Sequence, residues 1–401
     1  MTENSLKPAL RYFLLLIVAA IWGYGIYSLS ISEPKQWDFK TYYYGAIAHD
    51  RALNWWDPVV LSGVARADIK LAYVYPPLTV WFFKPLTWLD FSAAYQVWLF
   101  VKVLLLALLV FLWCKAFLKD EDPAIILLFA TLAYGSSAYW DLVAGNIGIF
   151  EQAVLWLGLY GLLKHRLWLF TACVLLISLF KLTFIIFLAL PLLLRDRTAL
   201  RFALVGSALF VGYLLLNYLT YAHEFSVFWS IITSIDERGE VYNHSLLAFC
   251  RDLIDIFRGT GTVAGNTMLG STIYVVLAAV ILWQSWLAWR RQKPGDSHDD
   301  FLTSLALFTL TYALIMPRMK TYSFVLLIPA SLLVMRRYLT PQNFVFLFIL
   351  LSLTKWTPLP FPDSARLLWW YYPWLTALLI WVLLIVGLRR GHLLDTAKTT
   401  P

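Results

Sequence analysis

The sequence predicts an all-α polytopic membrane protein, and three observations support this fold class. Of 401 residues, 61% are hydrophobic and 14% are charged, whereas a soluble domain is roughly 45–50% apolar and about 25% charged. Apolar runs of near-membrane length recur along the whole chain. Aromatic residues, including 20 Trp, make up 17% of the chain, and their amphipathic rings favour the membrane–water boundary. We therefore expect residues 1–401 to form a single integral membrane domain.

Twelve apolar runs divide the chain into predicted spans. They lie at residues 10–31, 92–117, 123–140, 148–163, 167–180, 182–194, 199–220, 267–289, 301–316, 321–335, 342–356 and 369–388. A straight span needs about 20 residues, so 167–194 suits one long helix or two short ones. We predict two short helices that meet at Lys181, because one merged span would invert the charge asymmetry of the later loops.

The charge distribution predicts the orientation in the membrane. With twelve spans, one side holds 17 Lys/Arg in short loops and tails against nine acids, which is typical of the cytoplasmic side. Both termini, including a tail at 391–401, are then cytoplasmic, in a bacterial inner membrane. This asymmetry explains the net charge of +8 without a nucleic-acid partner.

Two long loops, 32–91 and 221–266, fall on the outer side and carry mixed charge. Long loops escape the charge rule, and loops of this length are usually functional. Residues 77–89 are apolar but too short to span, so we expect interfacial helices there. The chemistry is therefore expected on the non-cytoplasmic face.

Asp38 is the candidate base, because it follows the first predicted span within a run of aromatic residues. A partly desolvated carboxylate is a better proton acceptor near neutral pH. On spacing alone, Asp38 also suits the N-cap of a helix that begins at Phe39, and the two interpretations are compatible.

Other outer-side residues are candidate ligands for sugar or phosphate. Tyr42, Tyr43 and Tyr75 offer aromatic faces for a sugar ring or a lipid tail, and equally suit interfacial anchors. Cationic candidates for phosphate or lipid headgroups are Arg66, Lys70, Lys181, Arg318 and Lys320. Polar candidates are Asn146 in an outer turn, and Asn243 and His244 in the second long loop.

Lys181 lies inside a long apolar stretch, where an ionisable residue indicates either a functional site or snorkelling to the interface. Arg318 and Lys320 occupy a short outer turn that breaks the charge asymmetry, and an anionic lipid phosphate would explain them. No Walker loop or HExxH motif occurs, and no ligand spacing stands out, so no cofactor is assigned; a divalent metal stays open.

Taken together, these segments resemble glycosyltransferase family 87 of the GT-C superfamily, which includes polyprenol-phosphate-mannose-dependent α-mannosyltransferases. The matching pieces, in the order of the family over residues 10–340, are Asp38-Phe39-Lys40-Thr41-Tyr42-Tyr43, Tyr75-Pro76-Pro77, Gly145-Asn146, Lys181 before Pro191 to Arg195, Asn243-His244-Ser245, and Pro317 to Tyr322.

The resemblance implies a GT-C fold and an inverting hexosyl transfer, with mannose as the expected sugar. The donor would be a polyprenyl-phosphate sugar, and the acceptor a lipid- or glycan-linked hydroxyl in cell-envelope synthesis. Asp38 would be the base, while Lys181, Arg318, Lys320 and His244 would stabilise the departing phosphate. The chain departs from the family at His244, where glutamine is common, and after Pro317, where histidine is common.

Two other functions remain open at this stage. A transporter or flippase of a lipid-linked glycan suits twelve spans with intramembrane cations, but would need charges along both halves of a path. A polymerase or ligase of the O-antigen type also acts on lipid-linked glycans at the outer face, usually through Arg and His of outer loops. This second class usually lacks an aspartate directly after the first span.

Overall fold

The computed structural model describes residues 7–31, 35–194, 198–234, 236–239, 243–258, 263–292, 297–353 and 363–398. Over these residues the chain is mostly helical, and the β-type pairing is an isolated bridge between Asn243 and Lys320. The predicted all-α class is therefore confirmed. Three cations used to predict the orientation, Arg195, Arg197 and Lys293, lie outside the described residues, as do residues 399–401 of the predicted tail.

Contacts group the chain into two compact units, which are described separately. Residues 16–112 and 138–235 form one, here called the Asp38 unit, and residues 1–15, 113–137 and 236–401 form the other, here called the Arg318 unit. Two helices, α1 (Pro8–Ser30) and α6 (Pro123–Ala144), contribute residues to both units.

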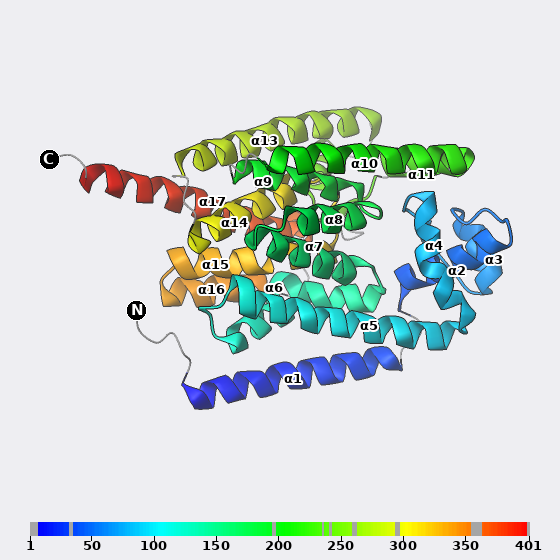
Figure 1. Cartoon of the computed structure of the whole chain (residues 1–401), viewed down its shortest axis with the longest axis horizontal. Helices are drawn as coiled ribbons and strands as arrows, with labels where there is room; N and C mark the ends of the chain where they lie inside the picture. The colour runs from blue at the N-terminus through cyan, green and yellow to red at the C-terminus, as the bar shows by residue number, and fades with distance from the viewer. Residues whose placement is uncertain are drawn as a thin grey trace. The chain divides into compact units, whose positions relative to one another are not determined.

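The Asp38 unit contains a cluster of short helices and a set of long ones (Figure 1). Its short helices are α2 (Trp37–Asp50), α3 (Pro58–Ala65) and α4 (Val80–Phe83), with 3₁₀ helices at Pro77–Thr79 and Lys84–Trp88. The remaining helices are α5 (Phe91–Leu112), α7 (Gly148–Leu163), α8 (Leu167–Ser178), the 3₁₀ helix Leu182–Ala189, α9 (Leu190–Leu193), α10 (Ala199–Thr220) and α11 (Ala222–Ser234). α7 packs against α5 and α8, and α8 packs against α10.

The Arg318 unit is built around α14, which packs against α13, α15 and α17. Its helices are α12 (Leu246–Arg258), α13 (Val263–Arg291), α14 (His298–Ile315), the 3₁₀ helix Thr321–Leu327, α15 (Ile328–Tyr338), α16 (Pro341–Leu351) and α17 (Asp363–Lys398). A π-helical turn at Trp113–Phe117 extends α5 into this unit. α12 packs on α13 and α17, so this part of the second long loop joins the helical core of the unit.

Six helical segments among the described residues are long and apolar enough to cross a membrane, which accounts for half of the expected runs. They are Pro8–Ser30, Phe91–Phe117, Pro123–Ala144, Ala199–Thr220, Thr267–Arg291 and Leu367–Arg390. Three shorter apolar helices are Gly148–Leu163, Leu167–Ser178 and Pro341–Leu351. The protein is therefore a helical membrane protein with several spans.

The third of these segments, α6, is not a continuous helix. Tyr134, Gly135 and Ser136 have φ values of 54°, 65° and 63°, in the left-handed region that only glycine adopts without cost. The Tyr134 hydroxyl is 2.6 Å from Ser331 Oγ, and this buried hydrogen bond ties the interrupted segment to α15. The two ends of α6 belong to different units.

The predicted break at Lys181 is confirmed. α8 ends at Ser178, Lys181 is extended with φ −115° and ψ 95°, and a 3₁₀ helix starts at Leu182. A carbonyl freed by this break, that of Leu179, accepts a hydrogen bond from the Tyr213 hydroxyl of α10 at 2.9 Å. Tertiary contact thus satisfies a backbone group that a broken helix leaves open inside an apolar region.

Candidate functional site

Asp38 lies in the first turn of α2 and is half-buried. The prediction that Asp38 caps a helix beginning at Phe39 is wrong, because α2 begins at Trp37 and Gln36 occupies the N-cap position. Gln36 is fully buried with φ 45°; its backbone N–H donates to the Val143 carbonyl. This long-range contact sets the start of the helix, so Asp38 is not required as a cap.

Asn146 contacts Asp38 directly and links it to two tyrosines. Asn146 Nδ2 donates to Asp38 Oδ2 at 2.8 Å and to the Tyr42 hydroxyl at 3.1 Å. The Tyr42 hydroxyl lies 2.9 Å from that of Tyr75, and both rings are buried. Four residues predicted as site residues therefore meet in one hydrogen-bonded set, here called the Asp38 cluster: Asp38, Tyr42, Tyr75 and Asn146.

The turn that carries Asn146 is tightly constrained. Gly145 has φ 68°, and a Cβ there would lie 2.7 Å from Phe39 Cβ, so only glycine fits. The Gly145 carbonyl accepts a hydrogen bond from Trp98 Nε1 at 2.9 Å, and Asn146 Oδ1 accepts one from the Gly148 N–H at 2.9 Å. These contacts fix the amide orientation of Asn146, with its oxygen on Gly148 and its nitrogen on Asp38.

A buried ion pair lies beside this turn and was not predicted from the sequence. Lys102 Nζ of α5 lies 2.6 Å from Asp141 Oδ1 of α6, and the two side chains are 1% and 0% exposed. Lys102 also donates to the Asp141 carbonyl, whose oxygen accepts the Asn146 N–H at 3.2 Å, and it interacts electrostatically with Asp38. Ionisable residues at such positions are costly in a membrane and usually functional. Lys102 is embedded in an apolar helix, and its acidic partner lies 39 residues away, so local pattern did not reveal the pair.

A second buried acid, Glu151, lies near Lys181. Glu151 is 4% exposed in α7, and it interacts electrostatically with both Lys181 and Asp141. Phe180, which precedes Lys181, packs edge-on against Tyr75 with ring centroids 6.0 Å apart. The Asp38 unit therefore combines three carboxylates, Asp38, Asp141 and Glu151, with the ammonium groups of Lys102 and Lys181.

The other predicted residues of this unit have different surroundings. The Tyr43 hydroxyl donates to the Leu89 carbonyl at 2.7 Å, and its ring packs against Tyr44 and Phe91. Arg66 ends α3 in an exposed position with φ 51°. Lys70 is exposed and lies 3.6 Å from Asp68. Tyr43 thus stabilises the junction of α2 and α5, whereas Arg66 and Lys70 border the surface.

In the Arg318 unit, one carboxylate holds both predicted cations. Glu237 accepts hydrogen bonds from Arg318 Nε at 2.7 Å and Arg318 Nη2 at 2.9 Å, and Lys320 Nζ lies 2.9 Å from its Oε2. Burial alone would raise the pKa of Glu237, but the charges of Arg318 and Lys320 outweigh it and hold this pKa below the ordinary value. A guanidinium and an ammonium focused on one anion form the arrangement that a phosphate would also satisfy.

Asn243 and His244 bind the Pro317–Lys320 turn to the second long loop. Asn243 Oδ1 accepts the Met319 N–H at 3.0 Å, and the His244 N–H donates to the Met319 carbonyl at 2.8 Å. The imidazole of His244 is fully buried, with Nδ1 donating to the Trp370 carbonyl and Nε2 lying 2.8 Å from Thr321 Oγ1. Both residues therefore position the turn that carries Arg318 and Lys320.

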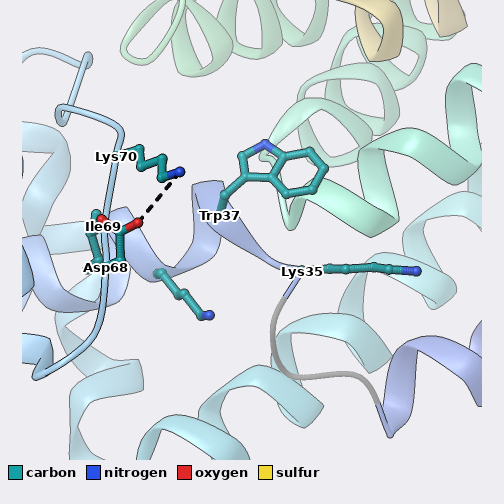
Figure 2. A pocket seen from close by; sticks show the side chains of 6 residues that line it. Lys35, Trp37, Asp68, Ile69 and Lys70 are labelled. Atoms are coloured by element: carbon teal, nitrogen blue, oxygen red, sulfur yellow. Dashed lines mark ion pairs between the residues drawn. The ribbon is translucent and has the colours of Figure 1, made fainter.

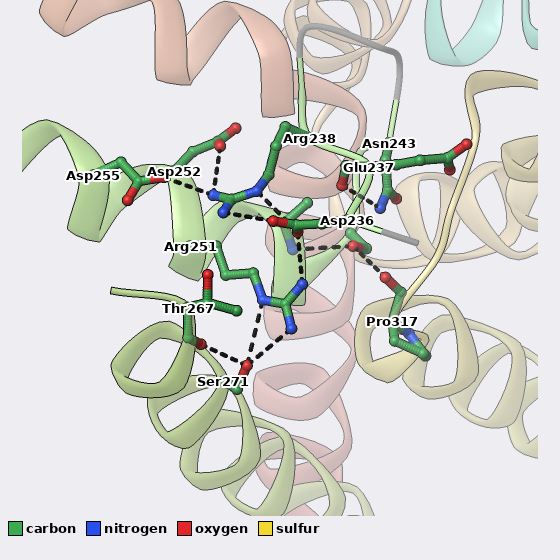
Figure 3. Close-up of polar contacts among 12 residues, drawn as sticks. Asp236, Glu237, Arg238, Asn243, Arg251, Asp252, Asp255, Thr267, Ser271 and Pro317 are labelled. Atoms are coloured by element: carbon green, nitrogen blue, oxygen red, sulfur yellow. Dashed lines mark hydrogen bonds and ion pairs between the residues drawn. The ribbon is translucent and has the colours of Figure 1, made fainter. Parts of the chain in front are cut away.

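An ion network beside Glu237 holds the same segment in place (Figure 3). Arg238 pairs with Asp236, Asp252 and Asp255 at 2.9–3.1 Å, and Arg251 pairs with Asp236 at 2.6 Å. The pKa of Asp236 is lowered, because the two arginines outweigh the effect of burial. Among the described residues, no group of three or more His, Cys, Asp or Glu side chains could hold a metal ion.

The fold and these clusters define a helical membrane protein in which the Asp38 carboxylate interacts with buried polar and charged residues. A family model for glycosyltransferase family 87 matches residues 73–317, which is more than half of the chain, and the chain therefore belongs to this family. It is a membrane glycosyltransferase. The match includes Tyr75, Asn146, Lys181, Asn243 and His244, and it ends before Arg318. Searches of curated proteins and of solved structures each gave no match.

Proposed function

We propose that the protein transfers a hexose, with mannose as the expected sugar, from a polyprenyl-phosphate donor to a hydroxyl of a lipid- or glycan-linked acceptor. The reaction takes place on the non-cytoplasmic face of a bacterial inner membrane, with twelve spans of a GT-C fold and both termini in the cytoplasm. Membership of glycosyltransferase family 87 supports the transferase class, and the asymmetry of Lys and Arg between short loops supports the orientation.

The observation that carries the proposal is the hydrogen bond from Asn146 Nδ2 to Asp38 Oδ2 at 2.8 Å. This contact orients the carboxylate of Asp38, and a positioned, half-buried carboxylate is suited to accept a proton. In the proposed step, Asp38 takes the proton of the acceptor hydroxyl while that oxygen attacks the anomeric carbon. The bond between this carbon and the phosphate oxygen breaks, and inversion follows from attack on the opposite face.

Polyprenyl phosphate leaves as an anion, so fixed positive charges lower the barrier. Lys181 in the Asp38 unit, and Arg318 and Lys320 in the Arg318 unit, are the proposed phosphate ligands. The contact between Arg318 and Glu237 supports this role, because its two parallel hydrogen bonds have the bidentate geometry in which a guanidinium also binds phosphate. Tyr42 and Tyr75 are proposed to bind the sugar or the lipid, while Tyr43, Asn243 and His244 support the site indirectly.

The test is transfer by the purified protein in liposomes with a polyprenyl-phosphate hexose and a lipid-linked acceptor. Asp38→Asn is expected to lower kcat by about 10²- to 10⁴-fold, the usual contribution of a general base. The matched control is Asp57→Asn in the same loop, because Asp57 caps α3 and asparagine is an equally good cap. It should keep wild-type activity.

Three outcomes would contradict the proposal. Full activity of Asp38→Asn would exclude Asp38 as the base, and rapid direct use of a nucleotide sugar without lipid carrier would exclude the donor class. Movement of a lipid-linked glycan across the membrane with no covalent product would instead support the transporter.

A further inference from the structure

A surface hollow of about 260 Å³ lies beside the first turn of α2, and no residue of the Asp38 cluster lines it (Figure 2). Six residues line it: Lys35, Trp37, Lys40, Asp68, Ile69 and Lys70. Trp37 and Lys40 are three residues apart on α2 and share one helix face, whereas Asp38 is turned about 100° from Trp37. Asp38 thus lies on a neighbouring face of α2.

The charge of this hollow is positive. Three ammonium groups, of Lys35, Lys40 and Lys70, and one carboxylate, that of Asp68, line it, which gives a formal charge of +2. The Lys70–Asp68 pair is 3.6 Å long, with side chains 82% and 74% exposed, and such exposed pairs are weak. Figure 2 shows Lys70 and Asp68 on one side of the Trp37 indole and Lys35 on the other. An anion can therefore compete with Asp68 for Lys70.

The walls of the hollow are held in place before any ligand binds. Ile69 is 4% exposed, and its N–H donates to Ser62 Oγ of α3 at 2.9 Å. Thr41 Oγ1 of α2 lies 3.4 Å from the Leu71 carbonyl, and this contact links α2 to the segment that carries Asp68, Ile69 and Lys70. Preformed walls reduce the entropy lost on binding.

We propose that this hollow, here called the lysine hollow, binds a phosphate ester at the membrane surface, with the Trp37 ring against its apolar neighbour. Indole rings favour the boundary between headgroups and hydrocarbon, and lysines at that level attract anionic headgroups. Trp37 is 40% exposed, so its ring is available for such a contact. The phosphate ester comes either from a bilayer phospholipid or from the lipid carrier of the substrate, and the second source rests on the proposed function.

The experiment measures retention of lipid by native mass spectrometry on the purified full-length protein in detergent. The probes are phosphatidylglycerol, polyprenyl monophosphate and, as the zwitterionic reference, phosphatidylcholine. The test variant combines Lys35→Gln, Lys40→Gln and Lys70→Gln. The control combines Lys115→Gln, Lys119→Gln and Lys164→Gln, which are exposed lysines elsewhere in the chain with the same total charge change.

Each lysine near a membrane surface contributes about 1 kcal/mol, which is roughly fivefold in affinity. The triple variant should therefore lose on the order of a hundredfold in affinity for one anionic lipid, while the control keeps it. Loss for phosphatidylglycerol identifies a bilayer headgroup, and loss confined to polyprenyl monophosphate identifies the carrier. Lys70→Gln alone provides a second variant that leaves packing intact, since this side chain is 82% exposed.

The proposal is overturned if the test and control variants retain both anionic lipids equally. Lipid retention requires no sugar transfer. A protein that binds the lipid through these lysines but transfers no sugar would refute the proposed function alone, and a protein that transfers normally without this binding would refute the lysine hollow alone.

Discussion

The buried pair of Lys102 and Asp141 gives the sharpest prediction about the structure. We consider Lys102→Met, Asp141→Asn and the double variant, in which both charges are removed with little change in volume. In Lys102→Met, the Asp141 carboxylate, which is 0% exposed, loses its cation. In Asp141→Asn, the Lys102 ammonium, which is 1% exposed, loses its anion. Each single change therefore creates an uncompensated buried charge.

The size of the effect follows from this burial. Breaking a buried ion pair from one side costs about 3–5 kcal/mol of unfolding free energy, whereas replacing both partners is often neutral. The separation of 2.6 Å places the pair at hydrogen-bonding distance, so the coupling should be large. We expect each single variant to lose about 3–5 kcal/mol, and the double variant to lose at least 2 kcal/mol less than their sum, a difference of about the size found for contacting residues.

The assay is equilibrium unfolding of the four proteins in mixed micelles, followed by tryptophan fluorescence and extrapolated linearly to zero denaturant. Lys115→Met, an exposed lysine on the π-helical turn that extends α5, is the control and should change stability by less than about 0.5 kcal/mol. Single variants that lose less than about 1 kcal/mol, or losses that simply add in the double variant, would refute a charged and coupled pair.

Two further predictions concern the turn beside Asp38 and the cations of the Arg318 unit. Gly145→Ala should destabilise the protein by about 1–3 kcal/mol and reduce transfer, because alanine is strained at φ 68° and its Cβ would collide with Gln36; unchanged melting temperature and activity would contradict this. In the folded protein, Arg318 and Lys320 outweigh the effect of burial and hold the pKa of Glu237 below its ordinary value of 4.5. Ionised Glu237 should therefore stabilise the folded state at pH values above 4.5, and this stabilisation should be lost as the pH falls below 4.5 and the carboxylate is protonated. Thermal unfolding between pH 3.5 and pH 7 measures it, and Glu237→Gln should flatten the acid limb; an unchanged acid limb would exclude Glu237 as its source.

Much of the fold could be predicted from local features of the sequence. Hydropathy is a property of composition over short windows, so the helical membrane class could be predicted without any knowledge of packing. The break at Lys181 was predictable from the charge asymmetry of the later loops. The helical turn starting at Pro77 was predictable because paired prolines restrict the backbone nearby. Hydropathy and loop charge also predict that Asp38 and Asn146 lie on the same side of the membrane.

The pairing of distant residues was not predictable in this way. Gln36 starts α2 because it contacts the segment near Val143, more than 100 residues later, and this displaces Asp38 from the cap position that local spacing favours. Glu237, which holds Arg318 and Lys320, is 81 residues from Arg318 and carries no motif. Such partners can be recognised only when the chain is folded.

The sequence by itself determined that this protein is a helical membrane protein with an acidic candidate at the end of its first span, since hydropathy and loop charge act locally. The tertiary structure decided which polar groups meet. Asn146 contacts Asp38, Lys102 pairs with Asp141, and Glu237 binds two cations. The physical reason is that a buried charge or amide is tolerated only with a partner, and partners are brought together by helix packing rather than by neighbouring sequence.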